Sequence, residues 1–272
     1  MAARAPRDRN SERRMSLGEH LVELRKRLMW AALAVVAGTI GGWFLYKPIW
    51  AALYDPISRI AEARGEDAAE IALTYTTITS PFEQQLMIAL VTGIVISSPV
   101  WLYEIFAFLV PGLNKREKRY TFGFFFTAVP LFLGGCATGW FVLPHIVEVM
   151  AGFLPAESSG LFDARPYLDF VLKLVLATGI AFVLPVFLVL LNFVGVLQGR
   201  TILKGWRWAV LAITVFAAIA TPAADVVSML LLMLPMIVLY FASVGVTMLH
   251  DRAVARRQER LLGGEGEPLP AA

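Results

Sequence analysis

Two glutamates in separate parts of the chain are each surrounded by basic residues. Glu23 lies in the stretch EHLVELRKRL, and Glu117 lies in GLNKREKRY. Neighbouring positive charge favours the ionised form of a carboxyl group, so both side chains are expected to be charged at neutral pH. An ionised carboxylate accepts two parallel hydrogen bonds from a guanidinium group. If the fold brings the two acids together, they form a binding site for a peptide with two adjacent arginines.

Simpler interpretations exist for each acid. Glu117 has Lys115 and Arg119 close by, and a local ion pair with either of them needs no ligand. Exposed ion pairs of that kind contribute less than about 1 kcal/mol to stability. The basic residues around Glu23 are also typical of a signal for membrane orientation, although such a signal does not account for the acids within it. Both alternatives stay open from these residues alone.

The composition is that of an integral membrane protein. Of the 272 residues, 58% are hydrophobic and only 17% are charged, whereas an average soluble domain has about 25% charged residues. A helix needs about 20 apolar residues to cross about 30 Å of hydrocarbon, and several stretches are that long. We therefore expect an all-α integral membrane protein. Nucleic acid is not an expected partner for basic residues that flank membrane spans.

Residue types that serve catalysis or metal binding do not cluster. The histidines His20, His145 and His250 lie in different regions, and neither a glycine-rich phosphate loop nor a nucleophile elbow occurs. Cys136 is the single cysteine, so an intrachain disulfide is excluded, and a small packed side chain is expected there. The sequence therefore predicts no enzyme activity, no metal and no cofactor.

Six membrane spans are predicted within one membrane domain over residues 16–250. Residues 1–15 are expected to be a disordered basic N-terminus and residues 251–272 a cytoplasmic tail. The fifth span has only 17 residues between Arg207 and Asp225. Such a helix is roughly 26 Å long, so the bilayer is expected to be thinner there. The spans cover about residues 29–46, 84–110, 121–147, 170–197, 208–222 and 226–249.

Basic residues gather on one side of these spans. They occupy the N-terminal segment, the loops after the second and fourth spans, and the C-terminal tail. The loops on the other side contain more acidic than basic residues. Because Lys and Arg are enriched on the cytoplasmic side of a membrane, both termini are predicted to be cytoplasmic.

The segment before the first span has a helical pattern. Ser16 and Glu19 have the spacing of a capping box. Four leucines recur on one helical face, namely Leu17, Leu21, Leu24 and Leu28. The pattern predicts an amphipathic helix that lies along the cytoplasmic interface before the first span.

Two of the predicted outer loops are long, residues 47–82 and 148–169. The first ends at Ser80 and Pro81, a pair typical of a helix start, with Ser80 as the cap and Pro81 in the first turn. Glu83 would then lie near the positive end of the helix dipole. The second predicted span follows directly.

Three segments resemble the signature segments of one family. They are EHLVELRKRL, SSPVWLYEIFAFLVPGLNKREKR and ATPAADVVSMLLLMLPM. The family is TatC, the multispanning receptor component of the twin-arginine protein translocase, and the resemblance covers about residues 16–250. It implies a cup-shaped protein of six membrane helices that binds twin-arginine signal peptides of folded proteins. It also implies export driven by the proton-motive force, with TatA and TatB or one bifunctional TatA as partners, in a homo-oligomeric receptor complex.

The resemblance carries over functional positions as well. Residues implicated in binding the signal peptide are matched by Glu23, Arg25, Leu28, Phe108, Pro111 and Glu117. Pro56 matches a position important for assembly or transport, and Asp225 matches an acid of the last outer loop with looser spacing. Among these residues, the resemblance ties Glu117 most directly to the twin arginines.

The chain departs from the family pattern at two positions. Val183 stands in GIAFVLPVF where the family often has Glu or Gln. Phe241 stands in VLYFASVG where a Glu commonly follows the tyrosine. The resemblance therefore implies no contact of TatA or TatB with a polar group at either position. Glu104, in LYEIF, is the acid that remains within an apolar run, and an acid in a membrane span indicates a function. The alternative is a shallow position without a function, because Glu104 is only about a turn and a half from the cytoplasmic end of the span at Pro111.

Two other functions fit the sequence less well. A secondary transporter of a small solute needs polar residues near the membrane midplane and paired broken helices. This chain has few polar residues within its predicted spans and no internal repeat. A membrane enzyme needs a nucleophile or base near an interface, and the candidates Glu148, Asp169 and Asp225 lack a partner histidine. A secondary transporter stays the alternative.

Overall fold

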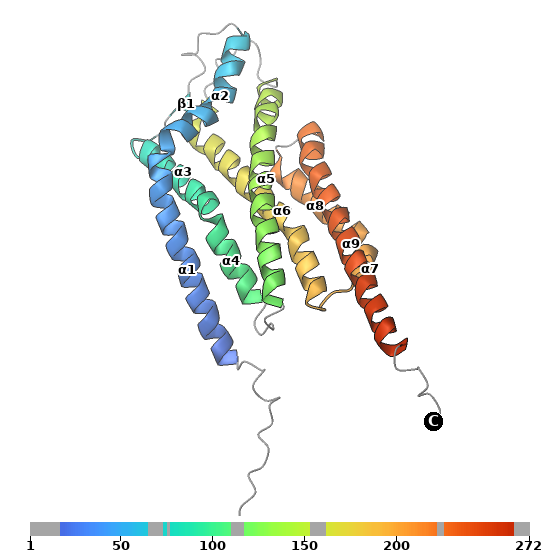
Figure 1. The fold of residues 1–272 in the computed structure, drawn as a ribbon. Coiled ribbons are helices and arrows are strands. Elements are labelled where there is room, and N and C mark those ends of the chain that lie inside the picture. The colour runs from blue at the N-terminus through green and yellow to red at the C-terminus, as the bar shows by residue number, and fades with distance from the viewer. Residues whose placement is uncertain are drawn as a thin grey trace, which may run out of the picture.

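Helices make up nearly all of the structure, a computed structural model that describes residues 17–64, 73–74, 77–109, 117–152, 162–221 and 226–263. Pro111, Asp225 and the predicted N-terminal segment 1–15 lie outside the described residues, and only the backbone of Glu117 is described. The elements are α1 (Leu17–Phe44), α2 (Tyr46–Arg64), β1 (Leu73–Thr74), α3 (Ser80–Ile96), α4 (Ser98–Leu109), α5 (Glu117–Gly152), β2 (Phe162–Asp163), α6 (Ala164–Phe193), α7 (Gly199–Lys204), α8 (Trp206–Ala220) and α9 (Val226–Gly263). Figure 1 shows the long helices side by side, with α1 at one edge and α8 and α9 at the other.

Four helices in the described part of the chain are long and apolar enough to cross a membrane: α1, α5, α6 and α9. The bent pair of α3 and α4 meets the same criteria when taken together, and α8, with 15 residues, is a shorter apolar helix. These elements lie where the six spans were predicted. The expectation of an all-α integral membrane protein is confirmed. The number of crossings stays a prediction, because only length and composition identify the spans.

The first helix differs from its prediction. α1 runs without a break from Leu17 to Phe44, so the described residues from Leu17 onward contain no separate helix before the apolar part of α1. The stretch contains no proline, and its polar part is rich in residues that favour helix, so nothing ends the helix where the apolar part begins. At 1.5 Å per residue α1 is about 42 Å long, which exceeds a hydrocarbon layer of about 30 Å. Leu21 and Leu28 on its leucine face are exposed.

The second predicted span is broken into two helices that meet at an angle of 57°. Pro99 explains the break, because it has no amide hydrogen to donate and its ring crowds the preceding turn. The carbonyl of Ile94 accepts hydrogen bonds from Nε1 of Trp101 at 2.8 Å and from the Ser97 hydroxyl at 3.4 Å. Such internal partners are needed at a break inside a membrane, because lipid offers none. The bend gives α4, which carries Glu104, a direction of its own.

The start of α3 is shifted by one residue from its prediction. Thr79 is the N-cap, and Ser80, the predicted cap, is the first helical residue. The hydroxyl of Ser80 does not cap the helix, since it shares a hydrogen bond of 2.7 Å with the hydroxyl of Thr77. Pro81 and Glu83 lie in the first turn, as predicted.

The first outer loop, predicted over residues 47–82, contains a helix that was not predicted. α2 lies at the end of the molecule opposite to the start of α1 (Figure 1). It packs on the core through the buried residues Leu53, Pro56 and Ile57. The Tyr167 hydroxyl on α6 donates a hydrogen bond to the Leu53 carbonyl at 2.7 Å. This part of the chain is therefore a packed element.

The second outer loop, predicted over residues 148–169, is shorter than expected, because α5 and α6 extend into it from both sides. β1 and β2 join the two outer segments as a parallel pair, with Leu73 opposite Phe162. Beside this strand pair, an ion pair of 3.0 Å between Glu83 and Arg165 links α3 to α6. The two outer segments thus support each other.

Close packing fixes the position of α1 on the other helices. α1 lies against α3 and α4, while α5 and α6 pack along each other and α9 packs on α6 and α8. A Cβ on Gly38 of α1 would overlap the backbone of Gly93 on α3, and a Cβ on Gly93 would overlap α1. Cys136 is buried in a cluster with Phe132 and Val183, which confirms its expected role as a packed side chain.

Candidate functional site

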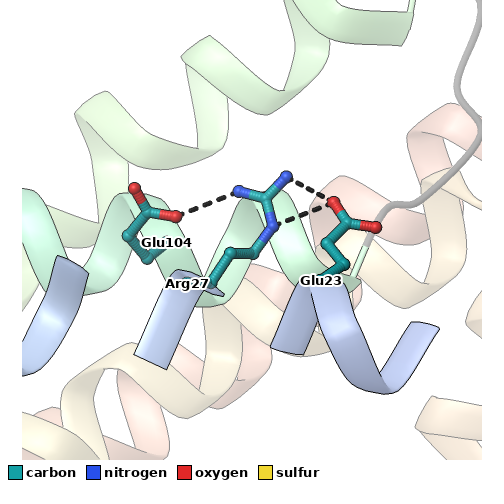
Figure 2. Close-up of polar contacts among 3 residues, drawn as sticks. All are labelled: Glu23, Arg27 and Glu104. Carbon is teal, nitrogen blue, oxygen red and sulfur yellow. Dashed lines mark hydrogen bonds and ion pairs between the residues drawn. The ribbon is translucent and has the colours of Figure 1, made fainter. Parts of the chain in front are cut away.

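Arg27 joins two carboxylates from different helices (Figure 2). Its Nε and Nη2 atoms donate hydrogen bonds to Oε1 of Glu23 at 3.0 and 2.7 Å, and Nη1 donates to Oε2 of Glu104 at 3.1 Å. Glu23 and Arg27 are four residues apart on α1 and share one face of that helix, whereas Glu104 comes from α4. The three side chains are 17–24% exposed. Salt and water therefore screen these ion pairs less than pairs on an open surface.

The cluster lies where the polar face of α1 meets α4. His20, one turn before Glu23, stacks on Phe108 of α4 with ring centroids 4.5 Å apart and planes at 22°. α1 and α4 are therefore joined twice, once by these rings and once by Arg27 with Glu104. The close glycine contact between α1 and α3 holds α1 in place for both contacts. This junction is on the half of the molecule where α1 begins and α4 ends (Figure 1).

The cluster contains one positive and two negative groups. With both carboxylates ionised its net charge is minus one, which attracts a further cation. Oε2 of Glu23 is covered and has no hydrogen-bond partner among the described residues. A hollow of about 870 Å³ opens beside the cluster, and Glu19, Lys26 and Tyr103 line it together with the three cluster residues. The described residues include no group of His, Cys, Asp and Glu that could hold a metal ion.

The structure places some of the predicted binding residues together. Glu23 is in the cluster and Phe108 supports it through the stacked histidine. Arg25 and Leu28 are exposed along α1. Glu117 is the first residue of α5, and the start of α5 lies at the same end of the molecule as the start of α1 (Figure 1). Joint binding by Glu23 and Glu117 stays a prediction, because the structure describes only the backbone of Glu117.

The other highlighted positions are spread over the molecule. Pro56 is buried in α2 at the opposite end, so it does not contact the cluster. Val183 is buried within the helix packing, and Phe241 is partly exposed on α9. The part played by Arg27 was not predicted. Its spacing of four residues from Glu23 could have predicted the ion pair with Glu23. The ion pair with Glu104 could not be predicted in this way, because Glu104 comes from another helix.

Comparisons with known proteins agree with this fold. The family model described as Sec-independent protein translocase protein (TatC) matches residues 19–235. The TatC protein of Xylanimonas cellulosilytica is 46% identical over 245 residues, which cover 90% of this chain and 88% of the relative. The TatC protein of Rothia mucilaginosa is 40% identical over 259 residues, which cover 95% and 87%. TatCy of Bacillus subtilis is 32% identical over 248 residues, which cover 90% and 92%.

Two crystal structures of the twin-arginine translocase receptor TatC are similar over most of their length. One has a TM-score of 0.69 at 30% identity and covers 85% of this chain and 99% of that chain. The other, in DDM, has a TM-score of 0.71 at 30% identity and covers 84% and 99%. Likeness of this extent in sequence and fold makes the protein a translocase component and not an enzyme. The chain belongs to the TatC family of Sec-independent protein translocase proteins.

Proposed function

We propose that this chain is the receptor that binds the twin-arginine signal peptides of folded proteins. One peptide arginine binds Glu23, and its neighbour binds Glu117, at the cytoplasmic ends of α1 and α5. The geometry of Glu23 is the observation that supports this most directly, because its carboxylate already accepts two hydrogen bonds from the guanidinium group of Arg27. A half-buried carboxylate with this geometry is suited to arginine more than to lysine, whose ammonium lacks the planar fork.

The remaining predicted residues have roles around the bound peptide. Arg25 and Leu28, which are exposed along α1, contact the peptide beside the arginine pair. Phe108 and Pro111 shape the recognition surface between α4 and α5. Pro56 and Asp225, which belong to outer segments of the chain, act in assembly or transport and not in peptide binding.

Export itself requires partners. The receptor works with TatA and TatB, or with one TatA that has both functions, in a homo-oligomeric complex in the cytoplasmic membrane. Both termini are cytoplasmic and the proton-motive force supplies the energy. The distribution of Lys and Arg along the chain supports this orientation. Because Val183 and Phe241 are apolar, contacts with these partners do not use a polar side chain at either position.

Peptide binding to the full-length protein in lipid nanodiscs tests the proposal. Fluorescence anisotropy would give the Kd of a peptide with the Arg-Arg pair and of the same peptide with Lys-Lys. Glu23→Gln and Glu117→Gln are each expected to raise the Kd for the Arg-Arg peptide about tenfold or more. A hydrogen bond to a charged group contributes about 1.5–3 kcal/mol, and about 1.4 kcal/mol corresponds to a factor of ten. The Lys-Lys peptide should bind the unaltered protein more weakly.

Glu148→Gln is the matched control for Glu117→Gln. Glu148 is an exposed acid near the other end of the same helix, α5, so its loss should leave the Kd unchanged. Equal binding of the Arg-Arg and Lys-Lys peptides, or unchanged binding in the double variant of Glu23 and Glu117, would show that these acids are not the arginine site.

A further inference from the structure

We propose that Arg27 is a built-in competitor for the peptide arginine, and that Glu104 retains Arg27 when the peptide takes Glu23. The inference rests on the proposed function, because it concerns the same carboxylate. It assigns Arg27 and Glu104 as positioning residues that set the affinity of the site. Neither residue is a direct peptide contact in this scheme.

The first argument is that the guanidinium position on Glu23 is already filled. One edge of Arg27, formed by Nε and Nη2, donates both of its hydrogen bonds to Oε1 of Glu23. The second oxygen, Oε2, is covered, so an incoming arginine does not reach it while the side chains keep this arrangement. Binding of a peptide arginine to Glu23 therefore requires Arg27 to withdraw.

The second argument is that Arg27 has another partner to which it can withdraw. Its Nη1 atom, on the opposite edge of the guanidinium group, donates to Glu104 at 3.1 Å (Figure 2). A charge in a half-buried position is costly when it loses every partner. Because Glu104 stays bound, Arg27 can leave Glu23 without becoming unpaired. After the exchange, Glu23 is paired with the peptide arginine and Arg27 is paired with Glu104. The added positive charge neutralises the excess negative charge of the cluster.

The third argument concerns access. The hollow of about 870 Å³ beside the cluster is bordered by Glu23, Arg27 and Glu104 and also by Lys26 and Glu19. A side chain that enters it arrives at the residues that take part in the exchange. Lys26 and Glu19 have opposite charges, so the charged lining of the hollow keeps the net charge of minus one that the cluster has. A ligand must offer better hydrogen-bond geometry than a single ammonium does.

Competition of this kind sets how strongly a peptide must bind before it fills the site. An arginine four residues away in the same helix acts at a high effective concentration, so weak ligands do not displace it. A lysine peptide cannot reproduce the two hydrogen bonds that one guanidinium group donates to Glu23, whereas a second arginine held at another site adds binding that a single arginine lacks. Arg27 thus raises the Kd of every peptide that must displace it by the same factor, so the weaker Lys-Lys peptide leaves the site empty at concentrations at which the Arg-Arg peptide still fills it.

The test measures peptide affinity in the full-length protein in lipid nanodiscs. Fluorescent peptides with Arg-Arg and Lys-Lys would be titrated against Glu104→Gln and against the double variant Arg27→Gln with Glu104→Gln. Glu104→Gln alone should weaken Arg-Arg binding several-fold. Arg27 would then have no second carboxylate in the cluster to pair with, so it would leave Glu23 less readily. The double variant should bind the Arg-Arg peptide about fivefold to tenfold more tightly than Glu104→Gln, and the Kd of the Lys-Lys peptide should fall as well. The double variant also avoids two unpaired carboxylates side by side, which Arg27→Gln alone would leave.

The outcomes separate this inference from the proposed function. If the unaltered protein prefers Arg-Arg but the double variant binds it no more tightly than Glu104→Gln does, while its Tm is unchanged, Arg27 is a structural residue and the inference is wrong. If the unaltered protein shows no preference for Arg-Arg, the proposed function itself fails. Arg59→Gln is the control, since Arg59 also pairs with an acid four residues away, Asp55 at 2.8 Å, but on α2 at the other end of the molecule. It should leave both affinities unchanged.

Discussion

At the scale of single residues, Asp251 on α9 accepts two hydrogen bonds that join α9 to the end of α6 and the start of α7. Oδ1 accepts from Nδ2 of Asn192 at 2.8 Å, and Oδ2 accepts from the backbone amide of Gly199 at 2.7 Å. Nδ2 of Asn192 also donates to the Leu197 carbonyl at 2.9 Å. Asp251 and Asn192 are 59 residues apart, so one carboxylate fixes a turn between two helices and the helix that packs on it.

Replacement of Asp251 by Ala should therefore destabilise the protein. The change removes two hydrogen bonds and leaves a buried amide without its partner, at a cost of about 2 kcal/mol or more. Thermal unfolding of the purified protein, followed by tryptophan fluorescence, should show a Tm several degrees lower. Glu259→Ala, at an exposed position of the same helix, should leave the Tm unchanged, and an equal loss in both variants would contradict the argument.

The Glu23 cluster shows how much of a site single residues reveal. The two acids in basic surroundings could be found from the sequence, because isolated charges of opposite sign stand out locally. The bridge from Arg27 to Glu104 could not, since the two residues are 77 positions apart. Their contact depends on the bend before α4 and on the close approach of α1 to α3. Local patterns identify candidates, whereas distant partners require the fold.

At the scale of elements, hydropathy located the apolar helices α1, α5, α6, α8 and α9 and the bent pair of α3 and α4, because each is an apolar run. It missed α2, which mixes charged and apolar residues and contains Pro56. The available signal was the recurrence of Ile49, Leu53 and Ile57 every four residues, which is typical of one helical face. The break between α3 and α4 was also missed, although Pro99 is a residue that interrupts helices. Both features depend on where the backbone forms or interrupts a helix, which the length of an apolar run does not show.

The contact between α1 and α3 gives a prediction at this scale. Gly38→Ala places a Cβ against the backbone of Gly93, and backbone cannot move aside as a flexible side chain can. Overpacking of this kind costs about 1–3 kcal/mol, so the Tm should fall. Affinity for the Arg-Arg peptide should fall as well, because Glu23 and Arg27 move relative to Glu104.

Gly41→Ala is the matched control on the same helix. A Cβ at Gly41 meets nothing within 4 Å, and alanine favours helix over glycine by about 1 kcal/mol. This variant should keep or raise the Tm and bind the peptide normally. Equal behaviour of the two variants would show that the close approach of α1 to α3 does not matter.

At the scale of the whole molecule, the two ends differ in character. The start of α1, the start of α5 and the end of α9 lie at one end, while α2 and the paired strands lie at the other (Figure 1). The basic segments adjoin the first end in the sequence. The proposed orientation places this end in the cytoplasm, where a signal peptide is presented before export.

Labelling of single cysteines in intact cells would test that orientation. Cys136→Ala removes the only native thiol, and new cysteines can replace Arg59 on α2 or Gln258 on α9, both exposed. A maleimide that does not cross membranes should label Arg59→Cys in intact cells and Gln258→Cys only after the cells are opened. The reverse pattern would invert the topology and with it the side on which peptides bind.

The length of α8 has a consequence for the surrounding lipid. Its 15 residues span about 22 Å, which is about 8 Å less than a typical hydrocarbon layer. A bilayer that dips to meet this helix stores elastic strain around its perimeter. Two short helices that share one dip store less strain than two that stand apart, so the lipid itself drives them together. As the predicted fifth span, α8 is expected to attract other short helices by their length, with no need for complementary side chains.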